Sequence, residues 1–273
     1  MTDSKDQPSL LHRPPEEYSV RPDVTGLRTL IVNVGFIGER GTSDWVLVDT
    51  GIHLSQEAIA SFAETNFSGP PLAIFLTHGH FDHVGSIGGL LDRWKVPVFA
   101  HEDELPFLTG KADYPPADPT VGGGLMAWIS PVYPHKGIDL SGHVQALPQD
   151  GSVPYMKEWA WLSTPGHSPG HVSFYRGKDR TLIAGDAFIT VKQESALDVM
   201  TQNKTIHGPP TYFTPHWEQA RDSVKKLEAL NPAYVLTGHG QPMEGEELQD
   251  GLRYLVTHFD EIAIPDHGRY VND

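Results

Sequence analysis

The sequence predicts an α/β fold with four layers, in which two β-sheets pack face to face and helices cover the outer face of each sheet. Short apolar runs alternate with amphipathic segments along much of the chain, as they do in βαβ units. Each half of the chain also follows one loose pattern: a strand that ends in Asp, a helix, and a strand that is followed by Thr and His. Residues 46–78 show this pattern first, and residues 182–239 repeat it. Two such halves would form an αββα sandwich whose strand ends meet along one edge.

The first half of the chain contributes four apolar runs bounded by Gly, Pro or polar residues, as strands are. These predicted strands are residues 30–37, 45–48, 72–76 and 96–100. Apolar residues at helical spacing also predict two helices. The predicted helices are residues 55–66 and 85–94.

The second half has the same composition of elements. Its predicted strands are residues 159–163, 172–175, 181–184 and 234–236. One clear amphipathic helix and one further helix are predicted from the spacing of apolar residues. These helices are residues 215–230 and 246–262.

We expect a single domain over residues 25–264. The flanking residues 1–24, which include four prolines, and 265–273 are predicted to be irregular tails. Residues 102–158 break the alternation of strands and helices with many Pro and Gly residues. Long irregular segments often carry function, so we interpret part of this insertion as a flap over the site. A loop that only decorates the surface is the alternative.

The composition limits the classes of partner. The 273 residues carry a formal net charge of −15, from 20 basic and 35 acidic residues, and include no Cys. This charge argues against nucleic acid and against an anionic membrane surface, because both attract basic proteins. The absence of Cys excludes disulfides, thiolate metal sites and a Cys nucleophile. The sequence has no apolar signal segment and no apolar run of membrane-spanning length, so we expect a cytoplasmic protein. The expected partner is a small-molecule substrate, and a homo-oligomer is possible.

A dense group of side chains that can bind metal follows the predicted strand 72–76. His78, His80, Asp82 and His83 fall within six residues. Neutral His nitrogen and anionic Asp oxygen form a ligand set that suits zinc, manganese or iron. A His-rich turn that is merely solvated is the alternative, but four such residues directly after a strand favour a metal site.

Further residues of these kinds come at other predicted strand ends, and they are Asp49, His167, Asp186 and His239. The motif H-x-H-x-D-H, followed downstream by Thr-Pro-Gly-His, Gly-Asp and Gly-His-Gly, resembles the metallo-β-lactamase superfamily over about residues 28–262. The run at residues 165–171 also resembles the glyoxalase II and lactonase branches of that superfamily.

The resemblance implies the metallo-β-lactamase fold and a site for two divalent metal ions. It implies that three His residues hold the first metal, that Asp and two His residues hold the second, and that one further Asp bridges both. In that order, these residues are His78, His80 and His167; Asp82, His83 and His239; and Asp186. Asp49 would orient the His turn through hydrogen bonds. Zinc is the expected metal, with iron and manganese as alternatives.

This ligand set predicts a metal-dependent hydrolase. Two metals can hold a bridging hydroxide that attacks the carbonyl carbon of an ester, thioester or lactone. Asp82 is the candidate catalytic residue, because it could carry a proton to the leaving group. A phosphodiesterase or nuclease on the same core, and a non-catalytic metal-binding module, are the alternatives.

Other side chains leave choices open. His171 is an alternative to His167 as a ligand, and His101 is interpreted as structural. The lactonases that the chain resembles carry a Tyr shortly after the bridging Asp, and Tyr133 or Tyr212 could replace it here. Residues 111–140 and 190–214 are expected to set substrate specificity. The C-terminal tail could bring one more His, His267, back to the site.

Overall fold

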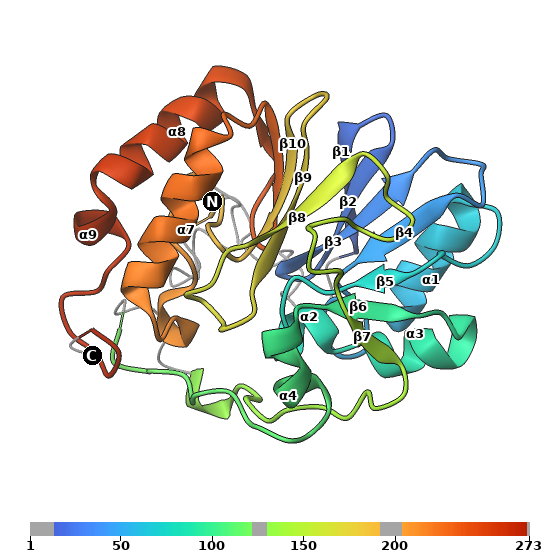
Figure 1. The fold of residues 1–273 in the computed structure, drawn as a ribbon, viewed down its shortest axis with the longest axis horizontal. Helices are drawn as coiled ribbons and strands as arrows, with labels where there is room; N and C mark the ends of the chain where they lie inside the picture. The colour runs from blue at the N-terminus through green and yellow to red at the C-terminus, as the bar shows by residue number, and fades with distance from the viewer. Residues whose placement is uncertain (1–13, 122–129, 192–203, 272–273) are drawn as a thin grey trace, which may run out of the picture.

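The computed structural model describes residues 14–121, 130–191 and 204–271, and it shows two β-sheets packed between two layers of helices (Figure 1). Among these residues the first sheet has seven strands, in the spatial order β1 (Glu16–Arg21), β2 (Val24–Thr29), β3 (Val32–Gly38), β4 (Trp45–Val48), β5 (Ile74–Phe75), β6 (Val98–Ala100) and β7 (Val144–Ala146). The second sheet has five, in the order β12 (Met243–Glu244), β11 (Tyr234–Thr237), β10 (Thr181–Gly185), β9 (Val172–Arg176) and β8 (Trp159–Ser163). The predicted αββα fold is confirmed.

Two long helices cover each sheet. They are α1 (Gln56–Asn66) and α3 (Ile87–Trp94) on the first sheet, and α7 (Trp217–Ala229) and α8 (Gly245–Thr257) on the second (Figure 1). The short helical segments are α2 (Phe81–Val84), α4 (Leu105–Leu108), α9 (Phe259–Ile262) and the 3₁₀ turns η2 (Glu102–Glu104), η3 (Ser130–Val132) and η4 (Thr211–Phe213). Within the described ranges, no helix combines the length and the apolar character that a membrane span requires.

Buried strands supply two apolar cores at once. In β4, Leu47 packs in the core under α1 and α3, whereas Val46 and Val48 pack in the core between the two sheets. In β10, Leu182 faces α7 and α8, and its neighbour Ile183 faces the first sheet. Successive side chains of a strand point to opposite faces, so each strand ties a helical layer to the centre of the sandwich. Each fully buried side chain of this size contributes roughly 1.5–3 kcal/mol.

Parallel pairs of strands bring the ligand-type residues to one edge. β4 and β5 are parallel and are connected through α1, and β10 and β11 are parallel and are connected through α7. β9 runs antiparallel to β10, so the connection between β8 and β9 reaches the same edge as the end of β10. The carboxyl ends of strands from both sheets therefore meet there.

The prediction of an irregular tail over residues 1–24 is wrong for its last nine residues. Residues 16–21 form β1, which pairs antiparallel with β2, and Val24 already belongs to β2. Val20 is the one buried residue of β1, so this edge strand lacks the apolar alternation that marks a half-buried strand. Residues 1–13 lie outside the described residues.

The strand predicted over residues 30–37 starts too early. Thr29 pairs with Val32 across a two-residue turn, and Leu30 in that turn has a φ of 62°. An apolar residue in the left-handed region is uncommon, so the continuous apolar run concealed a hairpin. Likewise the helix predicted over residues 246–262 is divided at His258 into α8 and α9.

The insertion at residues 102–158 contains more regular structure than predicted. Besides η2, α4 and η3, it supplies β7, which extends the first sheet parallel to β6. Residues 122–129, in the predicted flap, lie outside the described residues, and the role of the flap stays a prediction. The C-terminal tail packs on the insertion, with Tyr270 Oη donating to the Pro116 carbonyl oxygen at 2.6 Å. His267 itself is exposed and belongs to none of the groups of ligand-type side chains found among the described residues.

Candidate metal centre

The turn after β5 buries all four of its ligand-type side chains. The chain is extended at His80, and α2 begins at Phe81, so two His residues precede the helix and two further ligand-type residues lie inside it. Those side chains are His78, His80, Asp82 and His83, and each is buried. All four lie close to His167, Asp186 or His239, which come from the second sheet.

Hydrogen bonds hold the rings of His83 and His239 with one nitrogen facing the centre. His83 Nδ1 lies 2.8 Å from Asp49 Oδ2, and His239 Nδ1 lies 2.8 Å from the Ile31 carbonyl oxygen. Both oxygens accept, so each Nδ1 carries a proton and donates it. The Nε2 atom of both rings then faces inward.

Threonine hydroxyls hold two further rings in the same way. Thr77 Oγ1 donates to Asp49 Oδ2 and therefore accepts from His78 Nδ1 at 3.0 Å. Thr214 Oγ1 donates to a backbone oxygen and accepts from His167 Nδ1 at 3.1 Å. In these rings, too, Nε2 faces the centre. That of His78 has no hydrogen-bond partner among the described residues, and that of His167 lies 2.9 Å from His80 Nδ1.

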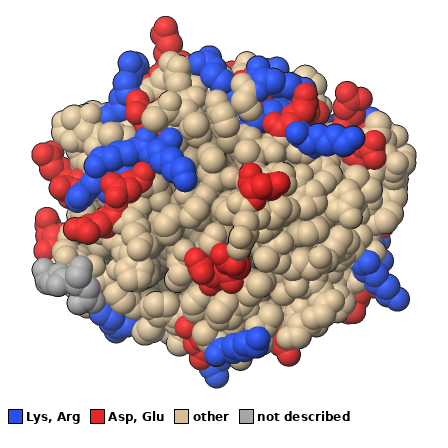
Figure 2. Space-filling view, in the orientation of Figure 1, with Lys and Arg blue, Asp and Glu red and all other residues tan. Residues whose placement is uncertain are grey.

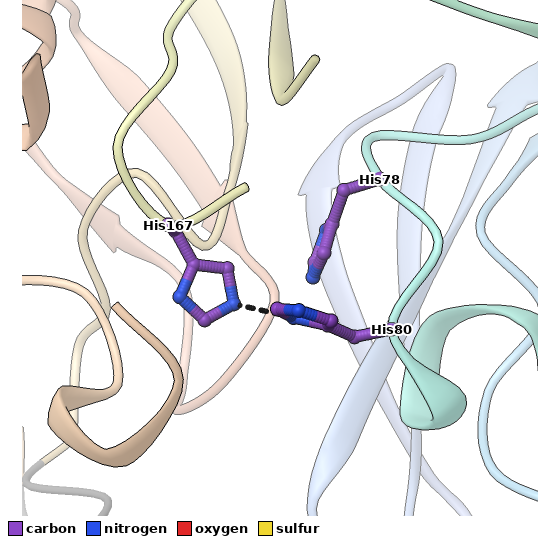
Figure 3. A group of neighbouring side chains, drawn as sticks. All are labelled: His78, His80 and His167. Atoms are coloured by element: carbon purple, nitrogen blue, oxygen red, sulfur yellow. Dashed lines mark hydrogen bonds between the residues drawn. The ribbon is translucent and has the colours of Figure 1, made fainter. Parts of the chain in front are cut away.

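Three groups of side chains converge at the strand ends, each with ligand atoms within 4.8 Å of one another. The groups are His78, His80 and His167; Asp82, His83 and His239; and His78, His83 and Asp186. Figure 3 shows the first group: the rings from the turn after β5 face the ring from the β8–β9 connection, and His80 Nδ1 lies 2.9 Å from His167 Nε2. All seven predicted ligands are thus brought together, while their role as ligands stays a prediction.

Asp186 lies between the first two of these groups. Its Oδ2 atom is 3.5 Å from His167 Nε2, 3.5 Å from His83 Nε2 and 3.2 Å from His239 Nε2. The residue directly follows β10, so the second sheet places this carboxylate. One oxygen therefore reaches rings that belong to both groups.

The pKa values of the His residues differ between the first group and the group that contains His239. Burial and the neighbouring rings hold the pKa of His78 well below its usual range, and burial lowers the pKa of His80 to about 4. Burial would also lower the pKa of His239, but the Asp186 and Asp82 carboxylates raise it to about 10. For Asp186, the rings beside it outweigh burial and hold its pKa well below the usual range. Cations bound beside these carboxylates would take the place of ring protons.

Unpaired polar atoms in the cluster fit a metal centre. His78 Nε2, His83 Nε2 and Asp186 Oδ1 are buried and have no hydrogen-bond partner among the described residues. Leaving such atoms buried without a partner costs roughly 1–3 kcal/mol each, a cost that coordination removes. The cluster offers nitrogen and oxygen donors, which suit zinc, iron and manganese. The residues present therefore fit two divalent cations.

Comparisons with known proteins agree with this geometry. Residues 27–239 match the family described as the Metallo-beta-lactamase superfamily. The chain belongs to this superfamily. A probable metallo-hydrolase of Bacillus subtilis (strain 168), YflN, is 49% identical over 248 residues, which cover 90% of this chain and 94% of the relative. YybB, a probable metallo-hydrolase of the same organism, is 31% identical over 218 residues, which cover 80% of this chain and 84% of the relative.

Solved structures of superfamily members share the fold. A beta-lactamase domain protein from Burkholderia ambifaria aligns with a TM-score of 0.60 at 21% identity, over 94% of this chain and 79% of that one. BJP-1, a subclass B3 metallo-beta-lactamase of Bradyrhizobium japonicum, aligns with a TM-score of 0.58 at 19% identity, over 93% and 95% of the two chains. The predicted superfamily and fold are confirmed, and the predicted enzyme class agrees with the metallo-hydrolase relatives. Membership of the glyoxalase II or lactonase branch stays a prediction.

Asp49 holds the turn after β5 through hydrogen bonds. It follows β4 in a left-handed conformation, with a φ of 61°. Its carboxylate accepts hydrogen bonds from Thr77 N, Thr77 Oγ1 and His83 Nδ1, each at 2.8 Å. These contacts fix the start of the turn and the plane of one ring, in line with the orienting role that the resemblance implied.

His171 lies outside the three groups, and so does His101. The Asp186 N–H donates to His171 Nε2 at 2.9 Å, and His171 Nδ1 donates to Thr164 Oγ1 at 2.9 Å. Both ring nitrogens are thus used, one of them to hold the backbone of Asp186. The preference for His167 over His171 as a ligand agrees with this geometry. The positioning role of His171 was missed, because sequence spacing says nothing about which loop a ring will contact.

Glu104 is a second residue that sequence reasoning missed. It ends η2, is fully buried, and accepts four hydrogen bonds. The donors are Gly79 N at 3.0 Å, Tyr114 Oη, Ser168 Oγ at 2.6 Å and Gly170 N at 2.8 Å. Burial raises the pKa of Glu104, and the four donors act against that rise. The two preceding residues are also acidic, so residue type alone did not distinguish it.

Aromatic side chains flank the centre on the side of the insertion. The ring centroid of Phe213 lies 4.9 Å from that of His80, and the rings of Tyr133 and Tyr212 lie 5.9 Å apart. Burial and the Asp82 carboxylate raise the pKa of Tyr133 to about 12. Tyr133 and Tyr212, the two candidates to replace the tyrosine of the lactonases, therefore lie beside the ligand turn. Tyr133 is close enough to Asp82 for the negative charge of this carboxylate to raise its pKa.

Proposed function

We propose that this protein is a dinuclear metal-dependent hydrolase that acts on a carbonyl substrate, namely an ester, thioester or lactone. The observation that carries this proposal is the overlap of the three buried groups: His78 and His83 each belong to two of them, and Asp186 reaches rings of both others. A structural zinc site is normally closed by four ligands, whereas each of these groups offers three. Open, adjacent cation positions favour a reactive centre over a structural one.

The residues have separate tasks in this proposal. The two groups on either side of Asp186 would each hold one cation, with zinc proposed as the metal. When bound, two divalent cations lower the pKa of water towards neutrality and stabilise negative charge on a carbonyl oxygen. The chain itself supplies preorganisation, because Asp49, the Ile31 carbonyl and the threonine hydroxyls already fix the inward nitrogens.

Asp82 is the proposed catalytic residue. Burial would raise its pKa, but the rings of His83 and His239 lower it, and its Oδ2 atom lies 3.3 Å from His239 Nε2. The carboxylate is therefore ionised at neutral pH. It can accept a proton from the attacking water and pass it to the leaving oxygen or sulfur.

Two features support an uncharged carbonyl substrate over a phosphodiester. Aromatic side chains gather beside the ligand turn, where they can pack against an apolar acyl or lactone group; they are Phe81, Tyr133, Tyr212 and Phe213. The net charge of the chain is −15, and on the face in Figure 2 basic side chains lie mostly towards the rim, interspersed with acidic ones. A polyanion would meet no continuous basic surface on that face.

Metal content tests the centre directly. Protein purified without chelator should contain about two transition-metal ions per chain, because the site offers two sets of ligands. His78→Ala and Asp186→Ala should lose metal and lose more than about 100-fold in kcat/KM while keeping the circular dichroism of the fold. A folded wild-type protein that contains no metal would rule out the dinuclear centre.

A substrate panel tests the reaction class. Nitrophenyl esters, thioesters and lactones should be hydrolysed, and bis-nitrophenyl phosphate should be hydrolysed much more slowly. Turnover of the phosphodiester alone would contradict the proposed substrate class and favour the phosphodiesterase alternative.

A further inference from the structure

The buried carboxylate of Glu104 joins the two loops that carry the first group of ligands. Its Oε2 atom accepts from the N–H of Gly79, the residue between the two His residues of the turn after β5. Its Oε1 atom accepts from Ser168 Oγ, directly after His167, and from the N–H of Gly170, two residues further on. One side chain from a third segment, η2, therefore bridges a loop of the first sheet and a loop of the second.

Both loops contact Glu104 through a backbone N–H, and each of these N–H groups belongs to a tightly packed glycine. A Cβ atom on Gly79 would lie 2.3 Å from Tyr114 Oη, and one on Gly170 would lie 2.7 Å from the backbone nitrogen of Glu104. Real Cβ atoms essentially never come closer than about 3.0 Å to such atoms. Both loops therefore lie directly against η2 and its partner Tyr114, and their separation follows from where Glu104 is held.

The charge of Glu104 is matched to its partners. Two of its four donors are backbone N–H groups, which can only donate, and they contact different carboxylate oxygens. A neutral amide of the same shape satisfies only one of them, because its NH₂ group faces the other N–H in either orientation. Replacement of Glu104 by Gln would thus release one of the two loops.

The other ligands are held by different residues. Asp49 orients His83, and the Ile31 carbonyl oxygen orients His239. Neither of these supports contacts Glu104, whose four hydrogen bonds all go to the loops around the first group or to Tyr114 of the insertion. The effect of Glu104 is therefore expected on one group of ligands.

We propose that Glu104 is a positioning residue that sets the metal affinity of the group formed by His78, His80 and His167, a role that rests on the proposed metal centre. It does so by holding two loops so that the ligand atoms of these three His residues stay within 4.8 Å of one another. Glu104 contacts no ligand side chain itself and acts through the backbone on either side of them.

The test compares Glu104→Gln with Glu102→Gln, which changes an exposed acid in the same 3₁₀ turn. Metal-free proteins are titrated with Zn²⁺ in competition with a chelator, which yields two stepwise dissociation constants. His167→Ala and His239→Ala identify which step belongs to which group. We expect Glu104→Gln to weaken the step that His167→Ala removes by roughly 10–100-fold and to leave the other step unchanged. Glu102→Gln should change neither.

A gentler variant covers the case in which Glu104→Gln does not fold. Tyr114→Phe combined with Ser168→Ala removes both hydroxyl donors and leaves both backbone N–H donors in place. It should weaken the same step, by less than the Glu104 variant does. No change in that step in this double variant would count against the proposal.

Two results would overturn the role of Glu104. One is that folded Glu104→Gln binds zinc with an unchanged dissociation constant in the step that His167→Ala removes. The other is equal weakening of both steps together with a lower melting temperature of the metal-free protein, which would indicate a general loss of packing. If His167→Ala binds zinc as the wild type does, the proposed metal centre fails instead, and the two failures are distinguishable.

Discussion

Gly238 lies where the end of β11 passes behind the central carboxylate. A Cβ atom at this position would lie 1.9 Å from Asp186 Oδ1 and 2.8 Å from His83 Cε1. Both distances are shorter than any real contact, so a side chain here has to displace a candidate ligand. A glycine is therefore required before His239 for steric reasons, because only a residue without a Cβ atom can lie this close to Asp186 and His83.

Gly238→Ala should therefore damage the metal centre more than the fold. Because displacement of a reacting group by about 1 Å can cost 100-fold, we expect a loss of at least that size in kcat/KM and a metal content below that of the wild type. Gly88→Ala is the matched control, since Gly88 is exposed in α3 and a Cβ there meets nothing within 4 Å. The control should keep its metal and gain roughly 0.5–1 kcal/mol in stability. Full metal content and wild-type affinity in Gly238→Ala would contradict the assigned position of Asp186.

The candidate ligands and Asp49 could be predicted from the sequence, whereas two other supporting residues could not. The candidate ligands stand out because His and Asp recur at fixed spacings and at strand ends, a signal that needs no tertiary structure. Glu104 and His171 gave no comparable signal. The donors to Glu104 come from positions 10 to 66 residues away, so its role exists only after the loops have met.

At the scale of elements, strands with two buried faces were predictable, whereas the edge strands of the first sheet were not. β4 and β10 are buried apolar runs, and their predicted positions agree with the structure to within one residue. β8 lies at the edge of the second sheet, but its run of Trp, Ala and Leu made it predictable as well. β1 and β7 lie at the two edges of the first sheet and are largely exposed, so no apolar pattern marks them. These strands are instead held by pairing with β2 and β6 and by contacts with other elements.

Arg176 at the end of β9 is one such contact between elements. Its side chain is buried, and it forms ion pairs with Asp23, in the β1–β2 turn, and with Asp179, at 2.8 Å for the latter. The hydrogen bond from Arg176 lowers the pKa of Asp23. Burial would raise the pKa of Asp179, but hydrogen bonds from Arg176 and Thr181 lower it to about 2. This cluster therefore ties the two sheets together at the end opposite to the metal centre.

Acid should weaken this tie in a defined range of pH. Both carboxyl groups have a lower pKa in the folded chain than the usual value near 4, so their stabilisation is complete above about pH 4 and is lost as the pH falls towards about 2. Asp179→Asn should lower the free energy of unfolding by roughly 1–2 kcal/mol at neutral pH and reduce its decrease with acid. Urea denaturation of metal-free protein between about pH 2 and pH 7 measures both effects. The control is Glu158→Gln, which removes an exposed ion pair with Lys178 and should show the pH dependence of the wild type. If the free energy of unfolding of Asp179→Asn falls with acid as steeply as that of the wild type, Asp179 does not have the proposed role.

At the scale of the whole molecule, the candidate metal centre is assembled by both sheets. The first sheet supplies the turn with His78 and His83, and the second sheet supplies Asp186 and His239. The sheets are also joined beside the centre without metal, because Asn33 Nδ2 donates to the carbonyl oxygens of residues 237 and 240 at 2.9 and 2.7 Å. We infer that the sandwich forms without metal and that bound cations add stability to it.

Removal of metal should therefore lower the melting temperature without abolishing the fold. A cation at 100 times its dissociation constant stabilises the folded state by about 2.7 kcal/mol per site, and in a chain of this size each kcal/mol corresponds to roughly 2–4 °C. Chelator-treated protein should melt roughly 5–10 °C lower per emptied site and recover on addition of Zn²⁺. Ca²⁺ at the same concentration should restore much less, because it prefers oxygen ligands and each group contains His nitrogen. His167→Ala and His239→Ala each remove a proposed ligand contributed by the second sheet, so each should lose about half of the recovery. If the melting temperature stays unchanged after loss of metal has been verified, the two sheets do not share the centre.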